Sequence, residues 1–306
     1  MKHDTAVLLL AYGTPATLDD VEAYFTHIRH GRTPPPAAVA NLKARYERVG
    51  GATPLLQLTE DVRNALRSRL AAGGTPVPVY MGMKHWHPYI ADTVQQMYDD
   101  GIRRFTALVL APHYSKMSIG QYRDTIEKKQ AELGNPFAIR FIDHWGDDPG
   151  FVQFMAQTVR AGLATFPEGE RGRVTVVFTA HSLPERIRTW NDPYEAQLQQ
   201  SAELVAKAAG LPGFRRAWQS AGGTGEPWIG PDILDFLDTL AGEGVKNVLQ
   251  VPIGFVSDHL EVLYDIDIEA RDKAKELGMT LHRTRLPNAQ PGFIEVIAAL
   301  VGQSDR

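Results

Sequence analysis

The stretch Val174–Ala180 reads VTVVFTA, and His181 and Ser182 follow it directly. A short, nearly continuous run of apolar and β-branched residues is typical of a strand that is buried on both faces of a parallel sheet. Five further runs of this kind are spread along the chain: Ala6–Ala11, Val77–Gly82, Ala107–Ala111, Arg216–Gln219 and Val248–Ile253. The sequence therefore predicts a core built on parallel strands.

Segments with helical periodicity lie between these runs. They are Thr17–Ile28, Leu58–Ala71, Tyr89–Asp99, Tyr194–Ala208 and Asp232–Leu240. The alternation of buried strands with helices predicts an α/β doubly wound architecture. Ligands of such folds bind beyond the carboxyl ends of the strands, so we look for chemistry directly after each apolar run.

Two parts of the chain resemble each other. Pro88 is followed 13 residues later by Gly101, and Pro231 is followed 13 residues later by Gly244. After each glycine come a β-branched residue, a base and an apolar strand. We interpret this pattern as two similar α/β halves.

The halves predict two domains, at residues 1–145 and 146–306, because Gly and Asp cluster before a proline around Asp143–Gly150. The last helical segment, at about 291–302, is expected to pack back on the N-terminal domain.

Composition narrows the class of protein. The 306 residues are 43% hydrophobic and 22% charged, with a net charge of −4, which fits a soluble globular protein and gives no basic field for nucleic acid. The chain has no cysteine, which excludes disulfides, thiolate nucleophiles and cysteine-ligated clusters. No run of 18 apolar residues occurs, so we expect a cytoplasmic protein without stable membrane insertion. No exposed apolar seam is evident, which favours a monomer.

The residues after the strands are rich in histidine. They are Tyr12-Gly13-Thr14, Lys84-His85-Trp86-His87, His113-Tyr114-Ser115, His181-Ser182 and Asp258-His259-Leu260-Glu261, which together hold five of the ten histidines. A single histidine at a strand end is more often a structural residue than a ligand. Several on one rim favour a site.

Three acidic residues, Glu261, Asp265 and Glu269, recur at steps of four. If this segment is helical, they line one face. A solvated acidic face is the simple interpretation; the functional one is a track for a cation, since carboxylates suit Mg²⁺, Mn²⁺ and Fe²⁺.

Other common motifs are absent. The chain has no phosphate-binding G-x-x-x-x-G-K-[ST] loop, and Gly222–Gly225 lacks the spacing of a dinucleotide fingerprint, so we interpret it as a loop. Ser182 lacks the flanking glycines of a nucleophile elbow and is a poor candidate for a hydrolase.

The motifs in chain order resemble those of the ferrochelatases over nearly the whole sequence. They are Ala11-Tyr12-Gly13-Thr14-Pro15, Thr26-His27-Ile28-Arg29, Arg45-Tyr46, Gly50-Gly51 with Thr53-Pro54-Leu55, Ala180-His181-Ser182-Leu183-Pro184, Trp218-Gln219-Ser220, Gly230-Pro231, and Val251–Phe255 through Asp258–Glu261. The resemblance implies two Rossmann-like domains with a porphyrin cleft between them. It also implies that His181 and Glu261 handle the metal, with Asp265 and Glu269 as an outer relay.

Within this family the chain looks like the soluble bacterial branch that acts on coproporphyrin III. The resemblance then implies a lyase of haem biosynthesis that inserts Fe²⁺, its substrate, to give coprohaem and two protons. It implies no resident cofactor, with Mg²⁺ or another divalent ion at the outer carboxylates as an additional expectation, and a transient partner of the same pathway.

The same resemblance assigns the porphyrin contacts. They are Tyr12, Arg29, Arg45, Tyr46, Thr53 and Tyr122. Tyr12 matches a tyrosine that can ligate the product iron, and the others match residues at the porphyrin carboxylates. Thr53 stands where serine is usual, so the hydroxyl is kept and a methyl group is added.

Elementary chemistry fits these roles. A neutral histidine can accept a pyrrole proton near neutrality, and four porphyrin carboxylates call for Arg and hydroxyl partners. Three alternatives stay open: a protoporphyrin IX ferrochelatase, a cobalt or sirohaem chelatase, and a haem or porphyrin carrier that does not catalyse. The acidic residues Glu261, Asp265 and Glu269 distinguish an enzyme from a carrier, because a carrier would not need them.

Overall fold

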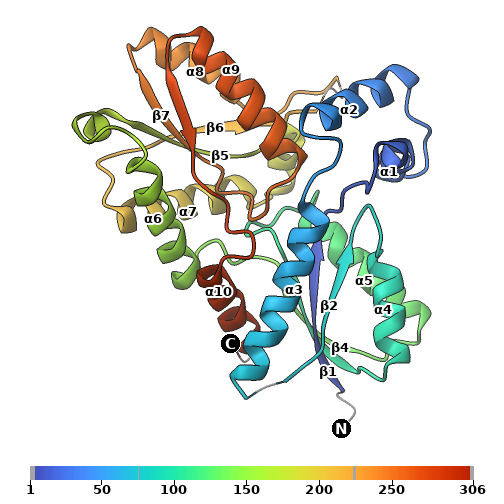
Figure 1. Cartoon of the computed structure of the whole chain (residues 1–306). Helices are drawn as coiled ribbons and strands as arrows, with labels where there is room; N and C mark the ends of the chain where they lie inside the picture. The colour runs from blue at the N-terminus through green and yellow to red at the C-terminus, as the bar shows by residue number, and fades with distance from the viewer. Residues whose placement is uncertain (1–3, 75, 223–224, 304–306) are drawn as a thin grey trace. The chain divides into compact units, whose positions relative to one another are not determined.

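Two four-stranded parallel sheets form the framework of the computed structural model of this chain (Figure 1). The structure describes residues 4–74, 76–222 and 225–303, so Gly223 and Thr224 of the predicted glycine-rich loop lie outside the described residues. The strand order of one sheet is β2 (Val79–Met83), β1 (Thr5–Ala11), β3 (Arg104–Val109) and β4 (Ala138–Ile142). That of the other is β6 (Arg215–Gln219), β5 (Thr175–His181), β7 (Asn247–Val251) and β8 (Thr280–Arg283). The equivalent orders confirm the predicted α/β class with two similar halves.

The chain divides into two compact units, each with one sheet. The first holds the residues up to His144, Ser257–His259 and the segment from Pro287 onward. The second holds Trp145–Val256 and Leu260–Leu286.

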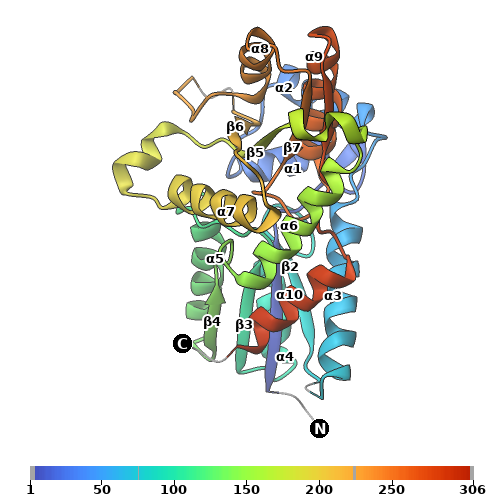
Figure 2. The same ribbon diagram turned by 90° about the vertical axis from the view of Figure 1, so that its left-hand side faces the viewer.

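Helices cover both faces of the sheet in the first unit. These are α3 (Leu55–Ala72), α4 (Ile90–Asp99), α5 (Ile119–Glu132) and α10 (Pro291–Gly302), whereas α1 (Val21–Ile28) and α2 (Pro36–Arg48) pack on each other away from the faces of the sheet (Figure 1). Leu8 and Leu10 of β1 pack with Val94 of α4 and Ile126 of α5 in one core cluster. Helix α3 lies on the opposite side of this sheet and packs against α10, where Glu295 accepts from Arg69 at 2.6 Å (Figures 1 and 2).

The second unit repeats this layering with α6 (Pro149–Leu163), α7 (Tyr194–Ala209), α8 (Ile233–Gly242) and α9 (Arg271–Glu276). Leu237 of α8 and Ala274 of α9 pack on Val177 and Val248 in one core cluster, and α6 and α7 pack on each other (Figure 2). A Cβ on Gly162 would come within 2.9 Å of Leu249 on β7, so only glycine allows α6 this approach.

Local sequence explains where several of these helices begin or end. The Asp232 side chain accepts from the backbone N–H of Leu234 and caps α8, and Asp148 caps α6 in the same way. Gly101 and Gly244, which follow α4 and α8 after one more residue each, have φ of 88° and 82°, a conformation that favours glycine. The spacing noticed in the sequence therefore marks equivalent helix ends in the two halves.

The segment from Val262 to Ala270 is a π-helix and leads into α9. The structure thereby confirms that the acidic segment is helical, with i→i+5 rather than i→i+4 bonding. None of the helices in the described parts of the chain is long and apolar enough to cross a bilayer.

Candidate functional site

The predicted site residues fall into two groups, one in each unit. Tyr12, Arg29, Arg45, Tyr46, Thr53 and Tyr122 belong to the first unit. His181, Glu261, Asp265 and Glu269 belong to the second. We describe each group by itself.

Tyr12 stands on the turn that follows β1, with 39% of its surface exposed. Gly13 has a φ of 96°, and a Cβ there would lie 2.9 Å from the backbone nitrogen of Trp86. The hydroxyl of Tyr24 donates to the Gly13 carbonyl at 3.2 Å, and the N–H of His85 donates to the Tyr12 carbonyl at 2.9 Å. The turn that presents Tyr12 is thus fixed from two sides.

Three buried hydroxyl groups meet behind this turn. Thr14 Oγ1 lies 2.8 Å from Thr53 Oγ1 and 3.2 Å from the Tyr46 hydroxyl. Each hydroxyl has one donor and two acceptor positions, so this trio can reorient its protons toward an incoming carboxylate. The structure places two predicted carboxylate contacts, Tyr46 and Thr53, on one shared partner, Thr14, which lies in a quoted motif but was not predicted as a porphyrin contact.

Lys84 lies between two of the predicted porphyrin contacts. Its Nζ is 5.6 Å from the ring centroid of Tyr12 and 5.3 Å from that of Tyr122. Burial lowers the pKa of Lys84 to about 8 and raises the pKa of the Tyr122 hydroxyl. A lysine this close to two aromatic faces gains cation–π attraction and links Tyr12 to Tyr122.

The two predicted arginines of this unit come from neighbouring helices. Arg29 caps the C-terminus of α1, is exposed, and has its guanidinium 5.9 Å from the Phe25 ring centroid. Arg45 lies in the last turn of α2, half-buried. Guanidinium groups in such positions suit bidentate pairing with carboxylates.

Two of the strand-end histidines are buried in the first unit. Burial is the main cause that lowers the pKa of His85, and of His113, to about 3. His85 Nδ1 lies 3.1 Å from His27 Nδ1. Both buried rings are therefore neutral near pH 7 and are packed as structural side chains.

His181 differs from these, because it is half-buried at the very end of β5. Its Nδ1 lies 2.5 Å from the Ser182 carbonyl, which can only accept, so Nδ1 carries the proton. In the neutral ring the lone pair is then on Nε2, the form that can take a proton or bind a metal. The rings of Trp228 and Phe255 flank it at 6.3 and 6.5 Å.

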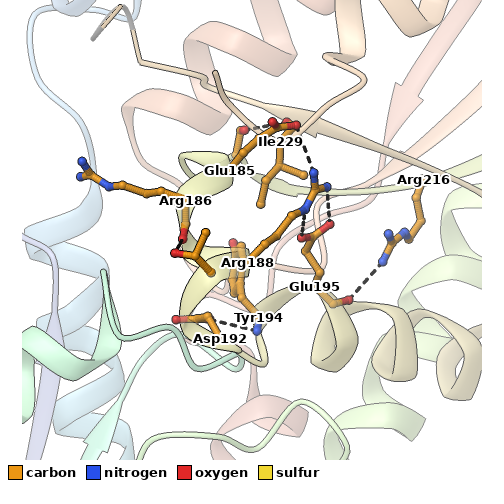
Figure 3. A network of polar contacts seen from close by, with 10 residues as sticks. Glu185, Arg186, Arg188, Asp192, Tyr194, Glu195, Arg216 and Ile229 are labelled. Atoms are coloured by element: carbon orange, nitrogen blue, oxygen red, sulfur yellow. Dashed lines mark hydrogen bonds and ion pairs between the residues drawn. The ribbon is translucent and has the colours of Figure 1, made fainter. Parts of the chain in front are cut away.

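The backbone of His181 is held by the segment that follows it. The hydroxyl of Tyr194, a buried residue at the start of α7, donates to the His181 carbonyl at 3.0 Å. Figure 3 shows Arg188 bridging Glu185 and Glu195, with Nε–Oε1 at 2.7 Å to Glu195. The turn after His181 is thereby tied to α7, and no sequence motif signals this role of Tyr194.

The acidic residues lie at and within the π-helix. Glu261 is its N-cap, and Asp265 and Glu269 follow at steps of four, slightly less than one π-helical turn, so the three stay on one side. Asp265 is only 6% exposed and accepts a short hydrogen bond from the Ser220 hydroxyl. Among the residues that the structure describes, no three histidine, aspartate or glutamate side chains are grouped closely enough to hold an ion.

Comparison with known proteins identifies relatives of the whole chain. The family model described as Ferrochelatase matches residues 4–305. A protein of Herpetosiphon aurantiacus named Ferrochelatase is 49% identical over 302 residues, covering 98% of this chain and 99% of its own. A protein of Geobacillus kaustophilus named Coproporphyrin III ferrochelatase is 45% identical over 304 residues, covering 98% of this chain and 96% of its own.

A solved structure has the same fold at low sequence identity. It is SirB from Bacillus subtilis with Fe³⁺, with a TM-score of 0.61 and 11% identity over 97% of this chain and 94% of that one. The match of the family model over nearly all residues, together with two relatives that are 45% identical or more over nearly their whole length, shows that this chain belongs to the ferrochelatase family.

Proposed function

We propose that this chain is a lyase that inserts Fe²⁺ into coproporphyrin III, releasing two protons and giving coprohaem for haem biosynthesis. Support comes from the Geobacillus kaustophilus relative, whose name specifies coproporphyrin III. The name of the Herpetosiphon relative specifies no porphyrin, so the choice of substrate is part of the proposal.

His181 is the proposed acceptor of the pyrrole protons and the first contact of the metal. The observation that carries this role is the bond from its Nδ1 to the Ser182 carbonyl, which leaves the lone pair of the neutral ring on Nε2. Glu261 is the proposed partner that neutralises the charge of Fe²⁺ and relays protons. Asp265 and Glu269 continue the carboxylate series as an outer relay on the same helical side.

The first unit supplies the proposed porphyrin contacts. Arg29 and Arg45 pair with carboxylates of the macrocycle, and the hydroxyls of Tyr46, Thr53 and Tyr122 donate to them. Tyr12, the most exposed of the aromatic residues in this group, is the proposed ligand of the product iron. Binding of a ring with four carboxylates through charge-assisted hydrogen bonds favours coproporphyrin over porphyrins with two.

The proposal also covers the compartment, the oligomeric state and the partners of the protein. The protein acts in the cytoplasm as a monomer and passes coprohaem to a transient partner of the same pathway. A divalent ion such as Mg²⁺ at Asp265 and Glu269 remains a prediction, which equilibrium dialysis of the protein with Mg²⁺ tests.

Replacement of His181 separates an enzyme from a porphyrin carrier. His181→Ala removes the proposed proton acceptor, so insertion of Fe²⁺ falls by at least about 100-fold, the usual weight of general acid–base catalysis. Coproporphyrin binding, followed by absorbance, stays close to that of the wild type. The matched control is His282→Ala, which removes another half-buried histidine, from β8 of the same unit. Retained turnover in His181→Ala refutes the assigned role.

A further inference from the structure

Gln219 connects the strand of His181 to the helix that carries the carboxylates. It is the last residue of β6, lies in register with His181 of β5, and is completely buried. Its backbone carbonyl accepts from the N–H of Ser182 at 2.7 Å. The residue therefore touches the turn that fixes the tautomer of His181.

The side-chain amide of Gln219 makes three contacts in other directions. Its Oε1 accepts from the Thr179 hydroxyl at 2.9 Å and from Gln250 Nε2 at 3.4 Å. With its oxygen held by the nearer donor, the Thr179 hydroxyl, the amide presents Nε2 to the Glu261 carbonyl, which accepts at 3.5 Å. Thr179, Gln219 and Gln250 come from three adjacent strands, and all are fully or almost fully buried.

Such a buried polar group needs its partners, because an unpaired amide in a core is costly. An apolar side chain would fill the same place in the sheet without that requirement. Within the part of the chain that the structure describes, the side-chain amide of Gln219 bonds to one residue outside the sheet, Glu261, the N-cap of the π-helix. The hydrogen bonds of Gln219 therefore connect the strand of His181 to Glu261.

We infer that Gln219 is a positioning residue for metal insertion, which holds the backbone of Glu261 in place relative to His181. The inference rests on the proposed function, because it takes His181 and Glu261 as the metal-handling pair. Gln219 touches neither metal nor porphyrin in this role. By holding this backbone, Gln219 determines which positions the Glu261 carboxylate can occupy.

The matched pair Gln219→Met and Gln250→Met tests this role. Both changes replace a buried amide of one network by an apolar side chain of similar length, but only Gln219 bonds to Glu261. With Fe²⁺ under anaerobic conditions, we expect Gln219→Met to raise the KM for Fe²⁺ and lower kcat, with kcat/KM for Fe²⁺ falling at least tenfold. The KM for coproporphyrin stays within twofold. Gln250→Met loses thermal stability to a similar degree, with its kinetics for Fe²⁺ within threefold of wild type.

A second variant covers the case in which Gln219→Met does not fold. Gln219→Glu keeps the shape and the acceptor oxygen; when ionised, its carboxylate has no donor for the Glu261 carbonyl and adds a negative charge next to it, so at a pH at which it is ionised it shows the same selective loss for Fe²⁺. When Glu261→Gln is already present, adding Gln219→Glu lowers kcat/KM for Fe²⁺ by less than a further twofold, because Gln219 acts through Glu261.

Three results overturn the inference. The first is unchanged kinetics for Fe²⁺ in Gln219→Glu, and the second is an equal loss of kcat/KM for Fe²⁺ in Gln219→Glu and Gln250→Met. The third is a loss in the Glu261→Gln, Gln219→Glu double variant that equals the product of the two single losses. Failure of the proposed function itself is visible separately, as absence of turnover in the wild type or its retention in His181→Ala.

Discussion

His181 and His113 both follow strands of their sheets, yet their surroundings give them opposite chemistry. His181 is half-buried, with its Nδ1 bound to a carbonyl and its ring flanked by Trp228 and Phe255. His113 is buried within the first unit, and burial lowers its pKa to about 3. The sequence places both histidines at strand ends but cannot tell them apart, because burial depends on packing from distant segments.

Replacing His113 makes folding less sensitive to acid. The folded state keeps His113 neutral down to about pH 3, whereas the unfolded chain takes up a proton near pH 6.5. The unfolded state then binds more protons between these values, so the stability of the wild type falls as pH falls through this window. His113→Gln lacks this contribution. The difference in free energy of unfolding between the wild type and this variant, measured in urea, therefore shifts by about 2 kcal/mol in favour of the variant as the pH falls from 6.5 to 5. A constant difference between the two proteins across this range contradicts the prediction.

Arg45 tests the carboxylate contacts. Loss of a charge-assisted hydrogen bond costs about 1.5–3 kcal/mol, so Arg45→Ala weakens coproporphyrin III binding by at least about tenfold. Protoporphyrin IX, which has two carboxylates fewer, loses much less affinity. Arg48→Ala, from the same last turn of α2, is the control and keeps both affinities. Fluorescence titration measures all of them; equal losses for both porphyrins in Arg45→Ala count against the contact.

At the scale of elements, the four central strands and the edge strands β2 and β6 were predictable, whereas the edge strands β4 and β8 were not. Runs such as Ala6–Ala11 are apolar because β1 is covered on both faces. The strands β4 and β8 lie at sheet edges, contain Arg140, His282 and Arg283, and give no comparable signal. Helices α2, α5 and α6 were missed as well, since α2 and α5 are largely polar and their packing faces narrow.

The π-helix shows a different limit of sequence reasoning. A spacing of four places Glu261, Asp265 and Glu269 on one side in either helix type, so the pattern predicts a shared face without distinguishing the hydrogen bonding. The buried state of Asp265 and its bond from Ser220 follow from the tertiary fold alone.

Gly13 tests how the turn after β1 is held. Gly13→Ala meets two costs, a positive φ and a close contact with the backbone of Trp86. Gly31→Ala is the matched control, because Gly31 has a φ of 83° with nothing near its Cβ position. We expect Gly13→Ala to lower the free energy of unfolding by about 2 kcal/mol, at least 1 kcal/mol more than Gly31→Ala. Equal destabilisation in urea titrations shows that contact with Trp86 is not needed.

Over the whole molecule, one α/β unit occurs twice, with different predicted site residues in each copy. In the first unit the predicted site residues are aromatic, hydroxyl and cationic, and Tyr12 and Tyr122 of α5 both lie close to Lys84. In the second they are His181 and the carboxylates of the π-helix. The repeated Pro-to-Gly spacing indicated the duplication from sequence, whereas the division of chemistry between the halves required the residue assignments of the family.

The activity proposed for this chain is the insertion of iron into coproporphyrin III. Anaerobic turnover with Fe²⁺ tests it most directly, with coproporphyrin III and protoporphyrin IX offered separately and each free-porphyrin spectrum followed over time. We predict rapid loss of free coproporphyrin and slow or no loss of protoporphyrin. A clear preference for protoporphyrin, or binding of both porphyrins without metal insertion, contradicts the claim.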